Sequence, residues 1–188
     1  MPTTKKAPDF LSSSIFKILI GAAIAFIFIF ILGGILSNSK GNLKNNIISL
    51  KLHVDNISSS ISTYQPNVKS SELRGYSASL ASVLSETSKD LTTYLEEVYE
   101  YKEKNTDEKI IANETALSEE LEATLFKAKI NGLLDRTYAH EMAYEISIIL
   151  ARESEIYNSV KAGFQEPLKS SYDSLANLYD KFNDFSEK

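Results

Sequence analysis

An apolar run near the N-terminus constrains this chain more than any other feature. From Ile18 to Leu36, 19 consecutive residues include no charged or strongly polar side chain. As an α-helix the run would extend roughly 28 Å, close to the ~30 Å hydrocarbon core of a bilayer. A core helix of a water-soluble protein is usually shorter and keeps a polar edge. We therefore expect a transmembrane helix over residues 15–36, preceded by a short polar tail at residues 1–14.

The same run could instead belong to a cleaved signal peptide, because Lys5, Lys6 and Lys17 precede it. Signal-peptide apolar regions span about 7–15 residues and end in a cleavage site of the Ala-x-Ala type. This run is longer and ends in Gly-Gly-Ile-Leu-Ser-Asn-Ser, which lacks such a motif. An uncleaved signal anchor in a single-pass membrane protein is therefore the favoured interpretation.

Charge bears on membrane orientation and on partners. Lysines flank the apolar run on both sides, so the positive-inside rule gives nearly a tie. A short basic tail before a first apolar segment usually stays in the cytoplasm, which favours an extracytoplasmic C-terminal domain. The whole chain carries −5 and its first 36 residues +2, which leaves −7 for the remaining 152. An acidic domain offers no basic footprint for nucleic acid, so no nucleic-acid partner is expected.

Beyond a polar linker at residues 37–46, the apolar residues fall into helical register. One seam has successive spacings of 4, 3, 4, 3, 4 and 3, and its members are Leu43, Ile47, Leu50, Val54, Ile57, Ile61 and Tyr64. Three heptads directly after a membrane helix fit a coiled-coil stalk between copies of the chain. The same spacing is required of a helix inside an antiparallel bundle, so both interpretations stay open.

Later apolar stripes predict four more helices. Their expected ranges are Ser70 or Ser71 to about Lys104, about Asp107 to Asn131, about Leu134 to Ala162, and from Pro167 to the C-terminus. Pro66 and Gly132 supply breaks between them, and no stretch alternates with period two. We expect an all-α fold, in which the transmembrane helix is followed at residues 47–188 by an elongated antiparallel bundle of four to five helices.

Motifs for metal binding or catalysis are incomplete. The sequence from His140 to Tyr144 begins like H-E-x-x-H but has tyrosine where the second histidine must stand. Neither His53 nor His140 follows a glutamate by three residues, as a di-iron carboxylate site requires. The chain has no cysteine, which excludes disulfides, thiol nucleophiles and cysteine-based zinc sites. No metal, no cofactor and no enzymatic activity are expected.

Paired acidic residues are interpreted as the solvated faces of amphipathic helices rather than as acid–base pairs. These are Glu96 with Glu97, Glu119 with Glu120, Glu153 with Glu155, and the acidic edge formed by Glu141 and Glu145. Tyrosines gather in the later helices, at positions 94, 99, 101, 138, 144, 157, 172 and 179. Tyrosine suits a ligand cavity, a protein-binding surface or the boundary of a helical core.

The layout of an anchor followed by long helices resembles the sensory part of bacterial membrane receptors, although no second apolar run of spanning length follows Leu36. The leading hypothesis is a membrane-anchored helical bundle that mediates protein–protein interaction or envelope organisation, through a protein partner or self-association. The alternative is an extracytoplasmic ligand-binding or sensory module with an aromatic pocket between helices, for which a small-molecule ligand stays open.

Overall fold

The computed structural model describes residues 41–186, and every regular element in that range is helical. Five α-helices are present there, and their bounds are α2 (Gly41–Tyr64), α3 (Ser71–Tyr99), α4 (Glu108–Ile130), α5 (Leu134–Tyr157) and α6 (Ala162–Ser186). Two 3₁₀ helices, η2 (Gln65–Asn67) and η3 (Glu103–Asn105), lie in the connections. The all-α helical bundle predicted from the apolar spacing is confirmed.

The segment expected to cross the membrane, residues 15–36, lies outside the described residues, as do the polar tail at 1–14 and the first part of the linker. Among the helices of residues 41–186, none is both long and apolar enough to span a bilayer. The second part of the expected linker is helical, because α2 includes residues 41–46. Gly41 and the asparagines that follow it therefore do not form the break that their composition suggested.

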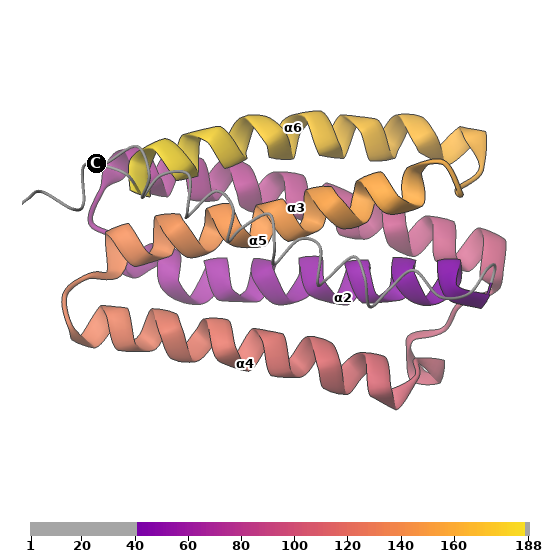
Figure 1. Cartoon of the computed structure of the whole chain (residues 1–188), viewed down its shortest axis with the longest axis horizontal. Coiled ribbons are helices and arrows are strands. Elements are labelled where there is room, and N and C mark those ends of the chain that lie inside the picture. The colour runs from indigo at the N-terminus through magenta and orange to yellow at the C-terminus, as the bar shows by residue number, and fades with distance from the viewer. Residues whose placement is uncertain (1–40, 187–188) are drawn as a thin grey trace, which may run out of the picture. The chain divides into compact units, whose positions relative to one another are not determined.

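Four of the helices form a ring in which each packs against two neighbours. In Figure 1, α2, α3, α6 and α5 follow one another around this ring, and every neighbouring pair runs antiparallel. Short connections join α2 to α3 and α5 to α6. This is the arrangement that amphipathic helices with short loops favour, since each apolar stripe can then face a common core.

The fifth helix, α4, packs outside this ring against α2 and α5 (Figure 1). It follows α3 in the chain and runs antiparallel to α3, yet its neighbour is α2, so α2 and α4 are parallel. Contacts confirm this direction, because Ser49 lies beside Glu114 whereas Ser60 lies further along beside Glu122. The prediction of a purely antiparallel bundle is therefore wrong for this pair.

The heptad seam of α2 lies inside the bundle. Six of its residues are buried in the common core, and Leu43 packs against that core while partly exposed. The same core cluster takes side chains from all four other helices, among them Leu84, Tyr138 and Phe182. A second copy of the chain would therefore have to bind through another face.

Local capping explains where several helices begin and end. Ser70 caps α3 by accepting a hydrogen bond from the Leu73 amide, and Asp107 caps α4 by accepting one from the Lys109 amide. Gly132 adopts a φ of +72°, a left-handed conformation that glycine reaches without strain, just after α4. These boundaries agree with the predicted ones.

Three further boundaries differ from the predictions, and one of them is the end of α5, which lies at Tyr157 rather than near Ala162. α3 ends at Tyr99 rather than near Lys104, because Glu100 turns left-handed with a φ of 49° and its amide bonds back to the Glu96 carbonyl. α6 begins at Ala162, so Pro167 lies inside the helix instead of near its start. The residues before the proline are held by packing, since Phe164 is buried and its ring stacks on Tyr94 with 4.4 Å between centroids.

Candidate functional site: buried carboxyl groups and the outer face of α4

A cluster of charged side chains lies buried where α2, α4 and α5 meet. We call it the histidine cluster, and its members are Ser49, His53, Glu114, Glu145 and Arg152. His53 is only 2% exposed and lies between two carboxylates, with Nδ1 3.2 Å from Glu114 and Nε2 2.9 Å from Glu145. Arg152 donates to Glu114 over 2.9 Å, and the Ser49 hydroxyl donates to the same oxygen. Two cationic groups therefore face two carboxylates.

Opposite charges in this cluster shift each other's protonation. Burial acts to lower the pKa of His53, but the contacts with Glu114 and Glu145 outweigh it, so the pKa lies above its usual value. Burial acts to raise the pKa of Glu114, but His53 and Arg152 outweigh it, so that pKa is lowered. At neutral pH both shifts favour the charged forms, which is the condition for a stabilising buried ion cluster.

Polar contacts also fasten the rest of α4 to α2. The Asn56 side chain donates to the Glu114 carbonyl over 3.0 Å, and Ser60 donates to the Glu122 carboxylate over 2.7 Å. The Tyr64 hydroxyl donates to the Glu122 carbonyl over 3.1 Å. The only large apolar side chains that α4 buries are Leu121 and Leu125, so its polar contacts with α2 contribute much to its position beside the ring.

A third buried carboxyl group lies between α5 and α6, at Glu153, which is 1% exposed. Its Oε1 accepts a hydrogen bond from the Ser171 hydroxyl over 2.6 Å, and the Thr87 hydroxyl lies 2.7 Å from that of Ser171. We call these three residues the Glu153 cluster. Among the described residues Oε2 has no hydrogen-bond partner. Burial raises the pKa of Glu153 to about 8, and only the hydrogen bond from Ser171 acts to lower it. The group is therefore mostly protonated at pH 7.

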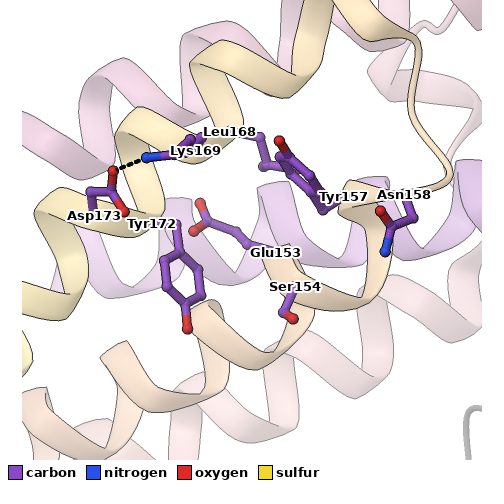
Figure 2. A pocket seen from close by; sticks show the side chains of 8 residues that line it. All are labelled: Glu153, Ser154, Tyr157, Asn158, Leu168, Lys169, Tyr172 and Asp173. Atoms are coloured by element: carbon purple, nitrogen blue, oxygen red, sulfur yellow. Dashed lines mark hydrogen bonds and ion pairs between the residues drawn. The ribbon is translucent and has the colours of Figure 1, made fainter.

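A pocket of about 380 Å³ adjoins this carboxyl group. Figure 2 shows Glu153 reaching from α5 toward α6, with the rings of Tyr157 and Tyr172 on either side of it. Lys169 also lines the pocket, but its ammonium group pairs with Asp173. The pocket therefore combines an apolar and aromatic wall with one carboxyl oxygen that lacks a partner.

The outer face of α4 carries exposed apolar residues in a regular pattern. Six residues follow spacings of 4, 3, 4, 3 and 4 and are all exposed, namely Ala112, Ala116, Glu119, Ala123, Phe126 and Ile130. We call them the outer seam. Phe126 is 58% and Ile130 68% exposed, unusually high for large apolar side chains. Small residues occupy the N-terminal half of the seam and large ones its C-terminal end.

Several interpretations of acidic residues and histidines can be compared with this geometry. The pairs Glu96–Glu97 and Glu119–Glu120 are exposed, as expected, and His140 is exposed too. Glu145 and Glu153 were interpreted as solvated and are in fact buried. Their spacing held a signal, because both lie in register with the apolar residues Met142, Ile149 and Ile156 of the same helix. Glu114 likewise lies seven residues before the buried Leu121.

The tyrosines do not converge on a single cavity. Tyr138 is buried in the core, Tyr144 is exposed, and Tyr157 and Tyr172 line the pocket beside Glu153. Tyr94 lines another pocket, of about 460 Å³, with Phe164.

Within residues 41–186, no group of three or more acidic or histidine side chains is placed to hold a metal ion. Comparisons of the chain with protein families, with curated proteins and with solved structures gave no match.

Proposed function

We propose that this chain is a single-pass membrane protein whose helical bundle mediates protein–protein contact, without enzymatic activity, and that its partner at the bundle is a second copy of itself. The apolar run at residues 15–36 supports anchoring, because its length and composition match a bilayer core. The observation that carries the pairing is the outer seam of α4. Five of its six residues are apolar and exposed, with Glu119 as the exception, and exposed apolar residues that gather on one face often mark an interaction surface.

The outer seam is complementary to itself in antiparallel orientation. If two copies of α4 pair about a two-fold axis at position 121, Ile130 of one copy faces Ala112 of the other, and Phe126 faces Ala116. Each large side chain then meets a small one, which is the condition for close packing between helices. A parallel pair would instead place phenylalanine on phenylalanine and alanine on alanine, which leaves a crowded end and a gap.

Charge supports the same orientation. The first turn of α4 holds Glu108, and its last turn holds Lys127 and Lys129. Antiparallel pairing brings the acidic start of one helix toward the basic end of the other, and it also opposes the two helix dipoles. A two-fold interface of this kind closes on itself and yields a dimer rather than a filament.

Single-cysteine crosslinking tests this arrangement, because the chain has no native cysteine. A cysteine at Ala123 lies only four residues, roughly 6 Å of rise, from its counterpart, whereas one at Ile130 lies 18 residues, roughly 27 Å, away. The full chain in a non-ionic detergent should therefore crosslink with a short bifunctional maleimide in the Ala123→Cys variant and not in the Ile130→Cys variant. Crosslinking of both variants would indicate parallel pairing, and crosslinking of neither would overturn the proposal.

Charge insertion gives an independent test by sedimentation. Phe126→Glu should convert the dimer to a monomer, because it places a carboxylate against the partner's Ala116. Ile111→Glu is the matched control, since Ile111 is also an exposed apolar residue of α4 but lies off the outer seam. Equal effects of the two variants would argue against pairing through this face.

Membrane topology can be tested separately. We propose that the tail lies in the cytoplasm and the bundle on the extracytoplasmic side. One variant carries a cysteine at Ser12 and a second variant carries one at Ser170. Intact cells that express each variant are treated with a membrane-impermeant maleimide. Labelling at position 170 alone agrees with the proposed topology, whereas labelling at position 12 alone reverses it.

The second candidate function is an extracytoplasmic ligand-binding or sensory module, and the pocket between α5 and α6 favours it. Its volume of about 380 Å³ lies within the range of small-molecule sites. Two tyrosines and one carboxyl group with an unpartnered oxygen line it. The probe titration in the following section tests this candidate.

A further inference from the structure

We propose that the pocket between α5 and α6 binds a small organic cation through its ammonium group, with Glu153 as the counter-ion. The inference rests on the second candidate function and does not depend on pairing through α4. It names the chemical class of the ligand and the residue that selects it.

The first argument is the unused bonding capacity of Glu153. At neutral pH Glu153 is mostly protonated, and because Ser171 donates to Oε1 the proton lies on Oε2, where the O–H group has no acceptor; a buried polar atom without a partner costs free energy. Oε1 is occupied by Ser171, but Oε2 has no partner among the described residues. The side chain lines the pocket and is aimed across it between Tyr157 and Tyr172 (Figure 2). Oε2 is itself shielded from solvent, so a small shift of the side chains around it, together with loss of its proton, would let an N–H donor of a ligand in this pocket satisfy that oxygen.

The second argument is the missing counter-charge. The other two buried carboxylates each lie against His53, although its 2.9 Å contact with Glu145 is a contact of charges in which neither Nε2 nor Oε2 makes a hydrogen bond. Glu153 contacts only a hydroxyl group, and no charged residue contributes to the shift of its pKa. The nearby Lys169 is turned toward Asp173, and that ion pair is more than half exposed. A ligand cation would supply what the protein does not.

The third argument concerns the kind of cation. A metal ion would need several ligands, and no suitable group of side chains exists within residues 41–186. The tyrosine rings provide apolar area and a negative π face, which attract an ammonium group attached to a hydrocarbon body. The pocket volume accommodates a molecule of the size of an aryl-alkyl amine rather than a peptide segment.

Binding of such a cation changes the protonation of the pocket. Glu153 is largely protonated in the empty pocket at pH 7, and an ammonium group favours the carboxylate. The O–H bond of Glu153 breaks, its proton goes to the buffer, and the ammonium N–H donates to the freed oxygen. Up to one proton is therefore released for each cation bound, and the release disappears above pH 8. Lys169, Asp173, Tyr157 and Tyr172 are the other titratable groups that line the pocket.

The test compares two probes of similar shape, benzylamine and benzyl alcohol. Their binding to the full chain is measured by titration calorimetry at pH 7, in two buffers of different ionisation enthalpy. Benzylamine should bind at least about tenfold more tightly than benzyl alcohol, and only its apparent enthalpy should depend on the buffer. Glu153→Gln should remove the preference for the amine and the proton release while retaining the pocket. Glu166→Gln, which removes an exposed carboxylate from α6, should change neither.

Equal affinity for the two probes, or an amine preference that survives in Glu153→Gln, would overturn the assignment of a cation. In either case measurable binding of benzyl alcohol would still support a small-molecule pocket. Absence of binding by both probes at about 10 mM would overturn the ligand-binding candidate as well.

Discussion

Two buried carboxyl sites lie on the same helix, eight residues or roughly 12 Å apart along α5, and they differ in how their charge is balanced. Glu145 belongs to the histidine cluster, where two carboxylates face His53 and Arg152. Glu153 belongs to a cluster whose other two members, Ser171 and Thr87, contribute hydroxyl groups only. The first arrangement lowers the pKa of Glu114 and so favours its charged form, whereas the second lets Glu153 hold a proton up to about pH 8. We therefore expect the histidine cluster to hold helices together, whereas Glu153 can accept a ligand as its missing partner.

The location of the two sites agrees with this division. The histidine cluster joins three helices and holds the N-terminal half of α4 on the ring, so its loss should loosen the fold. The Glu153 cluster borders a pocket, and its free oxygen is energetically unfavourable for the unliganded bundle. Residues that lower stability without an evident structural role are expected at functional sites.

The largest expected effect follows from breaking the histidine cluster at its central acceptor. Glu114→Ala removes a partner of His53, Arg152 and Ser49; it leaves Arg152 without its carboxylate and His53 with Glu145 alone. The free energy of unfolding should fall by about 3–5 kcal/mol, as for other buried ion pairs that lose one member. Urea unfolding of the full chain in a mild detergent measures it. Glu120→Ala, at an exposed position of the same helix, should stay within about 0.5 kcal/mol, and equal losses would contradict this role.

The opposite sign is expected at Glu153. The unfolded chain ionises this group near pH 4.3, but the folded chain keeps the proton to about pH 8, so the free energy of unfolding falls by up to about 1.4 kcal/mol per pH unit between these values. Glu153→Gln removes this loss and should stabilise the bundle by up to about 5 kcal/mol at pH 8, falling to about 1 kcal/mol at pH 5. Unfolding curves recorded from pH 5 to 8 measure the difference. Parallel pH profiles for the two proteins would contradict the burial of a protonated carboxyl group.

The pH dependence of His53 sharpens the comparison from the other side. Because its folded-state pKa is raised, its contribution is complete below about pH 6.5 and is lost as the pH rises through the folded value. In the Glu153→Gln background, His53→Gln should cost about 1–3 kcal/mol at pH 6 and less at higher pH. His140→Gln, at an exposed position, should cost little at either pH. An NMR titration that places the pKa of His53 below 6.5 would refute the ion cluster.

The sequence predicts the helices of this bundle well, but it predicts the buried charges poorly. Apolar spacing and the caps at Ser70 and Asp107 locate helices to within a few residues, because those signals are local. Pro167 was misjudged because the packing of Phe164 overrides the tendency of proline to start a helix. That α4 packs against α2 rather than against α3 could not be predicted, because no local sequence signal indicates which helix α4 contacts.

The carboxylates show why the functional residues are harder to predict than the fold. Glu114, Glu145 and Glu153 lie in register with apolar residues, which indicates burial but not the partner. Glu145 meets a histidine from α2 that is 92 residues away in sequence, whereas Glu153 meets a serine from α6. Whether a buried carboxyl group is charged or protonated depends on such distant neighbours, so it follows only from the packed structure.

The smallest expected effect concerns two buried tyrosines that differ in the same way as the two carboxyl sites. The Tyr64 hydroxyl donates to the Glu122 carbonyl, whereas that of Tyr138 has no hydrogen-bond partner among the described residues. Tyr64→Phe should cost about 1 kcal/mol, because it leaves the carbonyl without its donor. Tyr138→Phe should be neutral or slightly stabilising, within about 0.5 kcal/mol, since it removes only an unsatisfied hydroxyl. Urea unfolding of both variants measures the contrast. A larger loss for Tyr138→Phe would mean that its hydroxyl is satisfied, either by Ser77 or by ordered water. An unpartnered oxygen at Glu153 would then no longer argue for a ligand.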